Sequence, residues 1–63
     1  MRGMAKLKDV ANDVQIALQT VTRAEETLGR IFIKDVEKKN KVLHELKVLR
    51  FRLTKLREEL KEL

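Results

Sequence analysis

The chain contains no cysteine, proline, tryptophan, tyrosine or serine, and it has only two glycines and two phenylalanines. Without cysteine, neither a disulfide framework nor a thiolate metal site can stabilise so short a chain. Without proline, and with so little glycine, the sequence lacks most of the residues that mark turns and interrupt helices. These absences favour long helices over a sheet-rich fold.

The usual catalytic groups are also scarce. The single histidine, His44, falls on the predicted outer face of its helix, and no threonine has a base at helical spacing that would activate it as a nucleophile. Asp9 and Asp13 stand four residues apart, but no second pair of ligands lies near them in the sequence. We therefore predict a protein that is not an enzyme, with no cofactor, no metal and no small-molecule substrate.

Long hydrophobic runs are missing as well. No stretch approaches the roughly 20 apolar residues needed to span a bilayer. The charged residues near the start of the chain are not followed by the apolar core of a secretory signal. We expect no membrane span and a cytoplasmic or otherwise intracellular location, with a viral origin left open.

Charge is what the chain has in abundance. Charged residues make up 40% of its 63 residues, and nearly all of them are good helix formers. The net charge of +5 favours binding to polyanions through counterion release, whether or not a base is read. We predict a single all-α domain over residues 1–63, which at this length needs well-patterned helix packing together with oligomerisation.

A single heptad register organises the chain. From Val42 to Leu63 apolar residues alternate at spacings of four and three, with charges between them, as in the seam of a coiled coil or helical bundle. The first half follows the same spacing, and its polar members lie near the middle of the chain. We expect a homo-oligomer, most simply a dimer. The predicted oligomer interface consists of Leu7, Val14, Leu18, Val21, Val42, Leu46, Leu49, Leu53, Leu56 and Leu60.

Two architectures satisfy this register. The first is an antiparallel helical hairpin, with helices over about residues 4–28 and 35–63 and a turn over about 29–34. The second is one continuous long helix in an antiparallel coiled coil, which would use the same layers, such as Leu18 with Leu49. We favour the hairpin because Gly29 suits the C′ position after a helix end, and Asp35 suits the N-cap of a second helix.

The width of the apolar stripe indicates a further association. Val10, Ala17, Ala24 and Ile31 are spaced by seven and widen the stripe of the first helix beyond a two-stranded seam. We therefore expect two hairpins to dimerise into an antiparallel four-helix bundle. In size and hairpin form the chain resembles small homodimeric four-helix bundles, some of which bind RNA, but this resemblance of form carries no residue across.

The second helix also carries a basic surface, because no acidic residue interrupts the chain between Lys47 and Arg57. A basic helix with an exposed aromatic ring could bind phosphates and stack on a base, or contact an acidic partner. Upstream of it, Lys39 could reach Glu25 or Asp35 across the bend. The candidate polyanion or partner face consists of Lys47, Arg50, Phe51, Arg52, Lys55 and Arg57.

Two functions remain open from the sequence. The first is a non-enzymatic oligomeric scaffold or adaptor that acts through protein–protein interaction. The second is a small basic regulatory protein that binds nucleic acid through the basic face of the second helix. Reversing the charges of Arg50, Arg52 and Lys55 should leave the first function intact and abolish the second.

Overall fold

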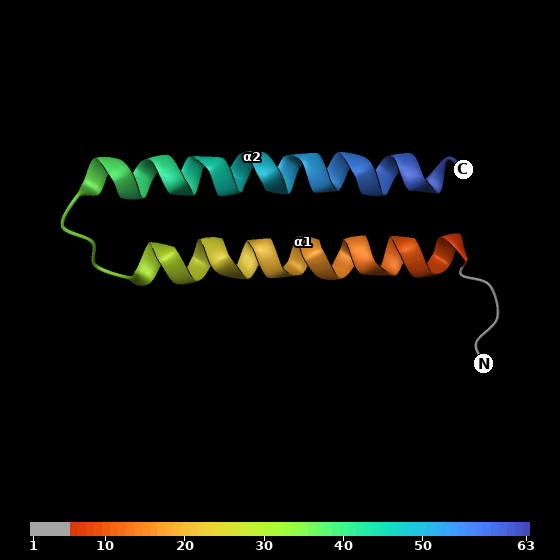
Figure 1. Ribbon diagram of the computed structural model, residues 1–63, viewed down its shortest axis with the longest axis horizontal. Coiled ribbons are helices and arrows are strands. Elements are labelled where there is room, and N and C mark those ends of the chain that lie inside the picture. The colour runs from red at the N-terminus through yellow and green to blue at the C-terminus, as the bar shows by residue number, and fades with distance from the viewer. Residues whose placement is uncertain (1–5) are drawn as a thin grey trace.

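The structure is a computed structural model that describes residues 6–63, which form two α-helices joined by a short loop. Helix α1 spans Leu7–Arg30, helix α2 spans Val36–Lys61, and the two lie side by side in antiparallel directions (Figure 1). Residues 6–63 contain no strand. The predicted all-α hairpin is confirmed, and the alternative of one continuous helix is not what the chain forms. The predicted start of the first helix, near residue 4, lies outside the described residues.

Short-range hydrogen bonds define where each helix begins. The backbone N–H of Lys6 donates to Asp9 Oδ2 at 3.2 Å, and the backbone N–H of Lys38 donates to Asp35 Oδ1 at 3.1 Å. The second bond confirms Asp35 as the N-cap of α2, because an aspartate there satisfies an amide that has no intrahelical partner. Asp9 and Glu37 add negative charge to the first turns, where the helix dipole favours it.

Gly29 does not end α1, so its predicted role as the C′ residue is wrong. The helix continues through Arg30, its C-cap is Ile31 with a φ of −84°, and Gly29 does not adopt a positive φ. The chain therefore leaves α1 in an extended conformation, which requires no left-handed residue.

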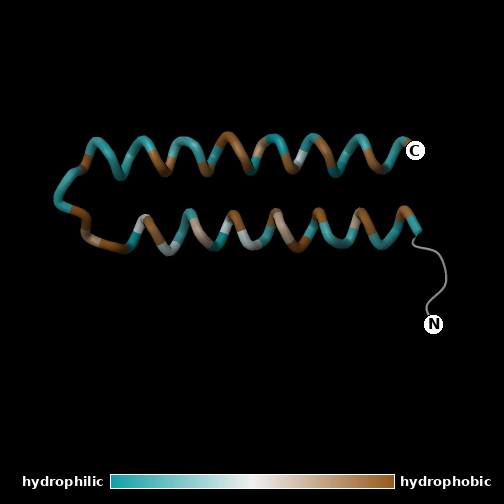
Figure 2. The backbone as a smooth tube through the Cα atoms, viewed as in Figure 1, coloured by the Kyte–Doolittle hydropathy of each residue, from teal (hydrophilic) through white to brown (hydrophobic). Residues whose placement is uncertain are grey.

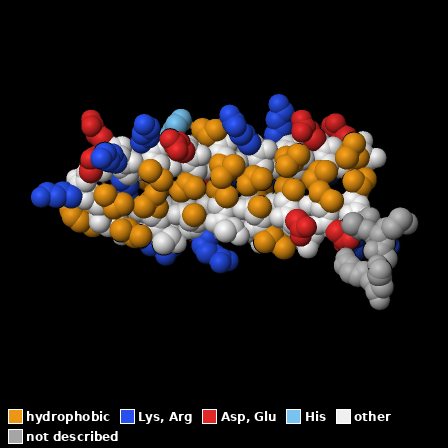
Figure 3. Space-filling view, in the orientation of Figure 1, with side chains coloured by type: hydrophobic (Ala, Val, Ile, Leu, Met, Phe, Trp, Pro, Cys, Tyr) orange, Lys and Arg blue, Asp and Glu red, His pale blue; other side chains and the backbone are white. Residues whose placement is uncertain are grey.

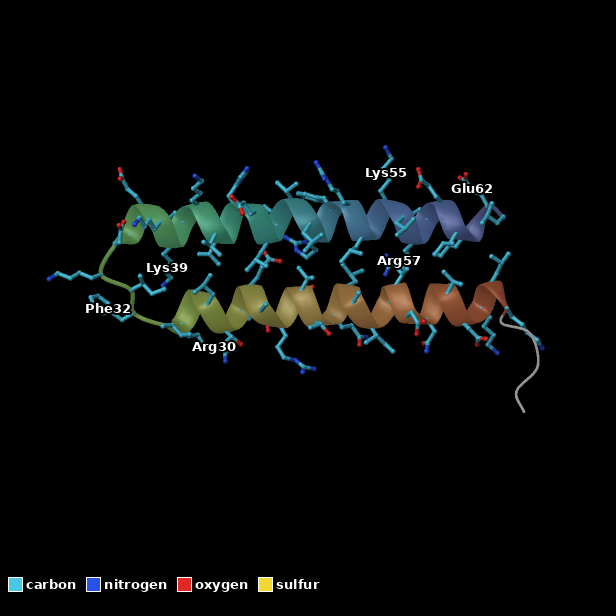
Figure 4. All side chains as sticks on the ribbon, viewed as in Figure 1. Arg30, Phe32, Lys39, Lys55, Arg57 and Glu62 are labelled. Atoms are coloured by element: carbon cyan, nitrogen blue, oxygen red, sulfur yellow. The ribbon has the colours of Figure 1, made fainter. Side chains whose placement is uncertain are left out.

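The side chain of Lys39 caps this end of α1. Its Nζ donates to the backbone carbonyl oxygens of Ile31 at 2.7 Å and Gly29 at 3.3 Å, and Figure 4 shows Lys39 reaching from α2 towards the end of α1. The last carbonyls of a helix lack intrahelical donors and carry partial negative charge, so a lysine stabilises them. The expectation that Lys39 pairs with Glu25 or Asp35 is wrong for this reason.

One of the hydrogen bonds between the helices corrects the predicted layers. Arg57 Nη1 donates to Gln15 Oε1 at 2.8 Å. The predicted pairing of Leu18 with Leu49 would instead place Gln15 opposite Arg52, five residues earlier in α2. The difference arises in the loop, because the first turns of α2 extend past the end of α1 (Figure 1).

The hairpin is a single layer of helices. Its shortest dimension is 12 Å, and its radius of gyration is 15.3 Å, against about 10.6 Å for a compact domain of this length. Apolar residues recur along the whole length of both helices (Figure 2), yet Leu18 is the only buried hydrophobic residue within 6–63, at 8% exposure. Stable domains normally pack two layers of secondary structure around a hydrophobic core. This hairpin supplies only one such layer.

We predict that Gly29→Ala raises the free energy of unfolding by about 0.5–1 kcal/mol, because alanine costs less backbone entropy in a helix than glycine. A Cβ at this position would meet nothing within 4 Å. Denaturant unfolding followed by circular dichroism measures the change. Gln19→Ala, at an exposed position of the same helix, is the control and should change the free energy by only a few tenths of a kcal/mol. A loss of stability in Gly29→Ala would instead indicate a left-handed helix end.

Candidate interaction surfaces

The side of α2 that meets α1 is only partly apolar. Half-buried residues recur along it at spacings of four and three, which is the geometry of a helix–helix seam. Leu46, Leu53 and Leu60 of the predicted seam belong to this row, and charged residues fill the positions between them. The half-buried row consists of Lys39, Leu43, Leu46, Arg50, Leu53, Arg57 and Leu60.

Arg50 joins the two helices instead of facing outwards. Its Nε lies 2.6 Å from Glu25 Oε1, and the side chains are 32% and 18% exposed, respectively. The Arg50 guanidinium carbon also lies 5.4 Å from the centroid of the Phe51 ring. A partly desolvated, hydrogen-bonded pair of this kind contributes more than a fully exposed ion pair.

Arg57 makes the second polar connection. Its side chain points from α2 towards α1 (Figure 4) and donates to Gln15, while Nη2 lies 3.7 Å from Glu58 Oε2. Arg57 Nε is buried and has no hydrogen-bond partner within residues 6–63. Arg50 and Arg57 are thus committed to the hairpin, and the candidate basic face retains Lys47, Phe51, Arg52 and Lys55, all of which are exposed.

A second row, on α2 and just past its end, is apolar and exposed, and three of its members stand immediately before or after a residue of the half-buried row. Val42, Leu49, Leu56 and Leu63 are spaced by seven and are 48%, 44%, 42% and 80% exposed. The first three belong to the predicted oligomer interface or its seam, but they do not pack between α1 and α2. The corresponding row on α1 consists of Val10, Ala17, Ala24 and Ile31.

These two rows lie on the same side of the hairpin. Ala17 stands immediately before the buried Leu18, and Leu49 immediately before the half-buried Arg50. In an antiparallel pair, residues that precede the facing positions of both helices project to the same side. Figure 3 shows hydrophobic side chains gathered along both helices on one face of the molecule. We call the eight residues of these two rows the apolar face.

The opposite side of the hairpin is polar. Two open grooves run between the helices there, one near each end. The first is lined by Lys8, Asp9, Ala11, Asn12, Gln15, Arg57 and Lys61, and the second by Glu25, Gly29, Asn40, Leu43, His44 and Lys47.

The remaining residues of the predicted oligomer interface lie on α1 and differ in their burial. Val14, Leu18 and Val21 are half-buried or buried beside α2, whereas Leu7 is 52% exposed.

Within residues 6–63, no group of three or more histidine, aspartate or glutamate side chains is arranged to hold a metal ion. Neither described helix is long and apolar enough to cross a membrane. Comparison of the chain with protein-family models, curated proteins and solved structures found no match.

Sequence reasoning missed the role of the two arginines because it treated the basic residues of α2 as one surface. A signal was nevertheless present. Arg50 and Arg57 are spaced by seven directly beside the leucine register, and Glu25 and Gln15 offer matching acceptors on the other helix. Long side chains flanking a seam can reach across it, so such a pair is better assigned to the helix interface.

We predict that Glu25→Arg and Arg50→Glu each lower the melting temperature, because each places like charges together at a half-buried position. The double exchange should recover most of the loss, with a coupling free energy of about 1 kcal/mol. Thermal unfolding monitored by circular dichroism measures all three variants. Glu26→Arg is the matched control, since Glu26 is exposed next to Glu25. Losses that simply add in the double exchange would contradict the pairing.

Proposed function

We propose that this chain is a non-enzymatic oligomeric scaffold that acts through protein–protein interaction. Its apolar face associates with a second copy, which forms a homodimeric antiparallel four-helix bundle. The observation that carries the proposal is that one side of the hairpin leaves six large hydrophobic side chains exposed, namely Val10, Ile31, Val42, Leu49, Leu56 and Leu63. A hairpin without a core of its own gains one when a second layer covers this face.

The amount of exposed surface supports association of this kind. The chain exposes 5589 Å², whereas a compact monomer of its mass exposes about 4,200 Å². The excess is about 1,400 Å², within the roughly 1,000–2,500 Å² that each partner contributes to an obligate interface.

The pattern of the apolar face favours a second copy over an unrelated segment. The face runs along both helices and contains no charged residue among its eight positions. A twofold-related copy presents the same apolar rows, so it leaves no charge buried without a partner. The lysines and glutamates on the remaining surfaces stay in water in such a dimer.

We predict that Leu56→Lys weakens dimerisation at least tenfold, because it buries a charge in the apolar face. Sedimentation equilibrium measures the dissociation constant, and circular dichroism reports any loss of helix that accompanies dissociation. Phe51→Lys is the matched control, since Phe51 is also an exposed hydrophobic residue, at 61%, but follows the charged seam row instead of preceding it. Equal effects of the two substitutions, or a wild-type chain that stays monomeric, would overturn the proposal.

The exposure of Phe51 supports a second candidate function, which is the binding of nucleic acid. Phe51 lies between Lys47 and Lys55 at spacings of four, so the three side chains form one exposed line along α2. A ring flanked by two ammonium groups can stack on a base while the ammonium groups contact phosphates. Arg50 and Arg57 contribute little here, because they are held by α1.

Binding to labelled single- and double-stranded RNA and DNA across a salt series separates the two functions. For a scaffold we expect no binding at low salt. For nucleic-acid binding, the affinity should fall linearly with salt on logarithmic axes, and Lys47→Glu with Lys55→Glu should reduce the slope by about two contacts. Lys38→Glu with Lys41→Glu, exposed near the start of α2, is the control for net charge. The arginines of the hairpin are left intact, so that a loss of binding does not reflect unfolding.

A further inference from the structure

Residues of the two rows of the apolar face lie at matching levels along the hairpin. Counting in opposite directions from the hydrogen bond between Gln15 and Arg57 brings each member of the α1 row level with a member of the α2 row to within one residue, and counting from the ion pair between Glu25 and Arg50 does so to within two. Each alanine of one row therefore lies beside a leucine of the other. The four levels are Val10 with Leu63, Ala17 with Leu56, Ala24 with Leu49, and Ile31 with Val42.

A second hairpin can cover this face in two ways that keep all neighbouring helices antiparallel. If both loops lie at the same end, α1 of each copy covers α2 of the other. If the loops lie at opposite ends, α1 covers α1 and α2 covers α2. The heptad rows fit the two arrangements differently, because the small residues are confined to α1 and the leucines to α2.

With both loops at the same end, Ala17 faces Leu56 of the second copy and Ala24 faces Leu49. Both of these central layers then combine a small side chain with a large one, so the helix–helix spacings across the middle of the dimer are alike. With the loops at opposite ends, alanines face alanines and leucines face leucines. One pair of helices would then be drawn together and the other held apart, which leaves voids that a close-packed interior does not tolerate.

We propose that the two hairpins associate with their loops at the same end, about a twofold axis parallel to the helices. This inference rests on the proposed dimer and specifies its geometry. It brings both copies of the loop to one end of the bundle. The exposed loop residue Phe32, at 87% exposure, then lies near its own counterpart in the second copy.

Distances between spin labels test this geometry, and the absence of cysteine allows a single label in each chain. Lys34→Cys labels the loop end and Glu62→Cys the open end, both at exposed positions outside the apolar face. Since neighbouring helix axes in a bundle lie about 10 Å apart, we expect both labels to give intermolecular distances within roughly 25 Å. The opposite arrangement separates each pair by about the length of α2, roughly 39 Å or more.

Gln19→Cys provides the control, because this exposed residue lies near the middle of α1 and gives a short intermolecular distance in either arrangement. A long distance at Lys34→Cys or Glu62→Cys, with a short one at Gln19→Cys, would overturn the same-end geometry and leave the dimer standing. The lack of any intermolecular distance at Gln19→Cys, together with a monomer in sedimentation, would overturn the proposed function itself.

Discussion

Two antiparallel helices can cover only one stripe of each other's surface, and this limit governs the rest of the structure. Both helices here carry more apolar residues than one stripe can hold. The hairpin buries a single leucine, Leu18, and leaves a row of hydrophobic side chains open along each helix. Six of the exposed large hydrophobic residues lie together on the apolar face, whereas Leu7, Ile16, Phe32, Val36 and Phe51 lie outside it. A second layer over the apolar face is therefore the natural completion of the fold.

Polar contacts join the two helices of the hairpin and cap the end of α1. The ion pair between Arg50 and Glu25 and the hydrogen bond between Arg57 and Gln15 join the helices, and Lys39 closes the end of α1. A slip of one heptad would separate these partners and leave half-buried charges without compensation, which costs more than the contacts themselves contribute. The polar contacts thus specify the register, whereas the apolar face remains available for association.

This division also bears on the choice between the two functions. A continuous basic surface would make nucleic acid the stronger candidate for a chain with a net charge of +5. Two of its six predicted members are held between the helices, however, and the exposed remainder is flanked by Glu45 before it and by Glu58 and Glu59 after it. The apolar face, in contrast, recurs at every seventh residue along both helices. The proposed scaffold therefore draws on the larger and more regular of the two surfaces.

Local chemistry in the sequence determined the helical segments and the N-cap at Asp35, since these depend on propensities and hydrogen bonds within a few residues. The tertiary structure alone decided which heptad row of α2 faces α1. Rows one residue apart, such as the one with Leu49 and the one with Arg50, have the same period, so spacing cannot separate them. The register, the pairing of Arg50 and the capping by Lys39 likewise depended on the path of the loop and on long side chains reaching a partner helix. Such contacts join residues far apart in the chain, where periodicity carries no information about which ones meet.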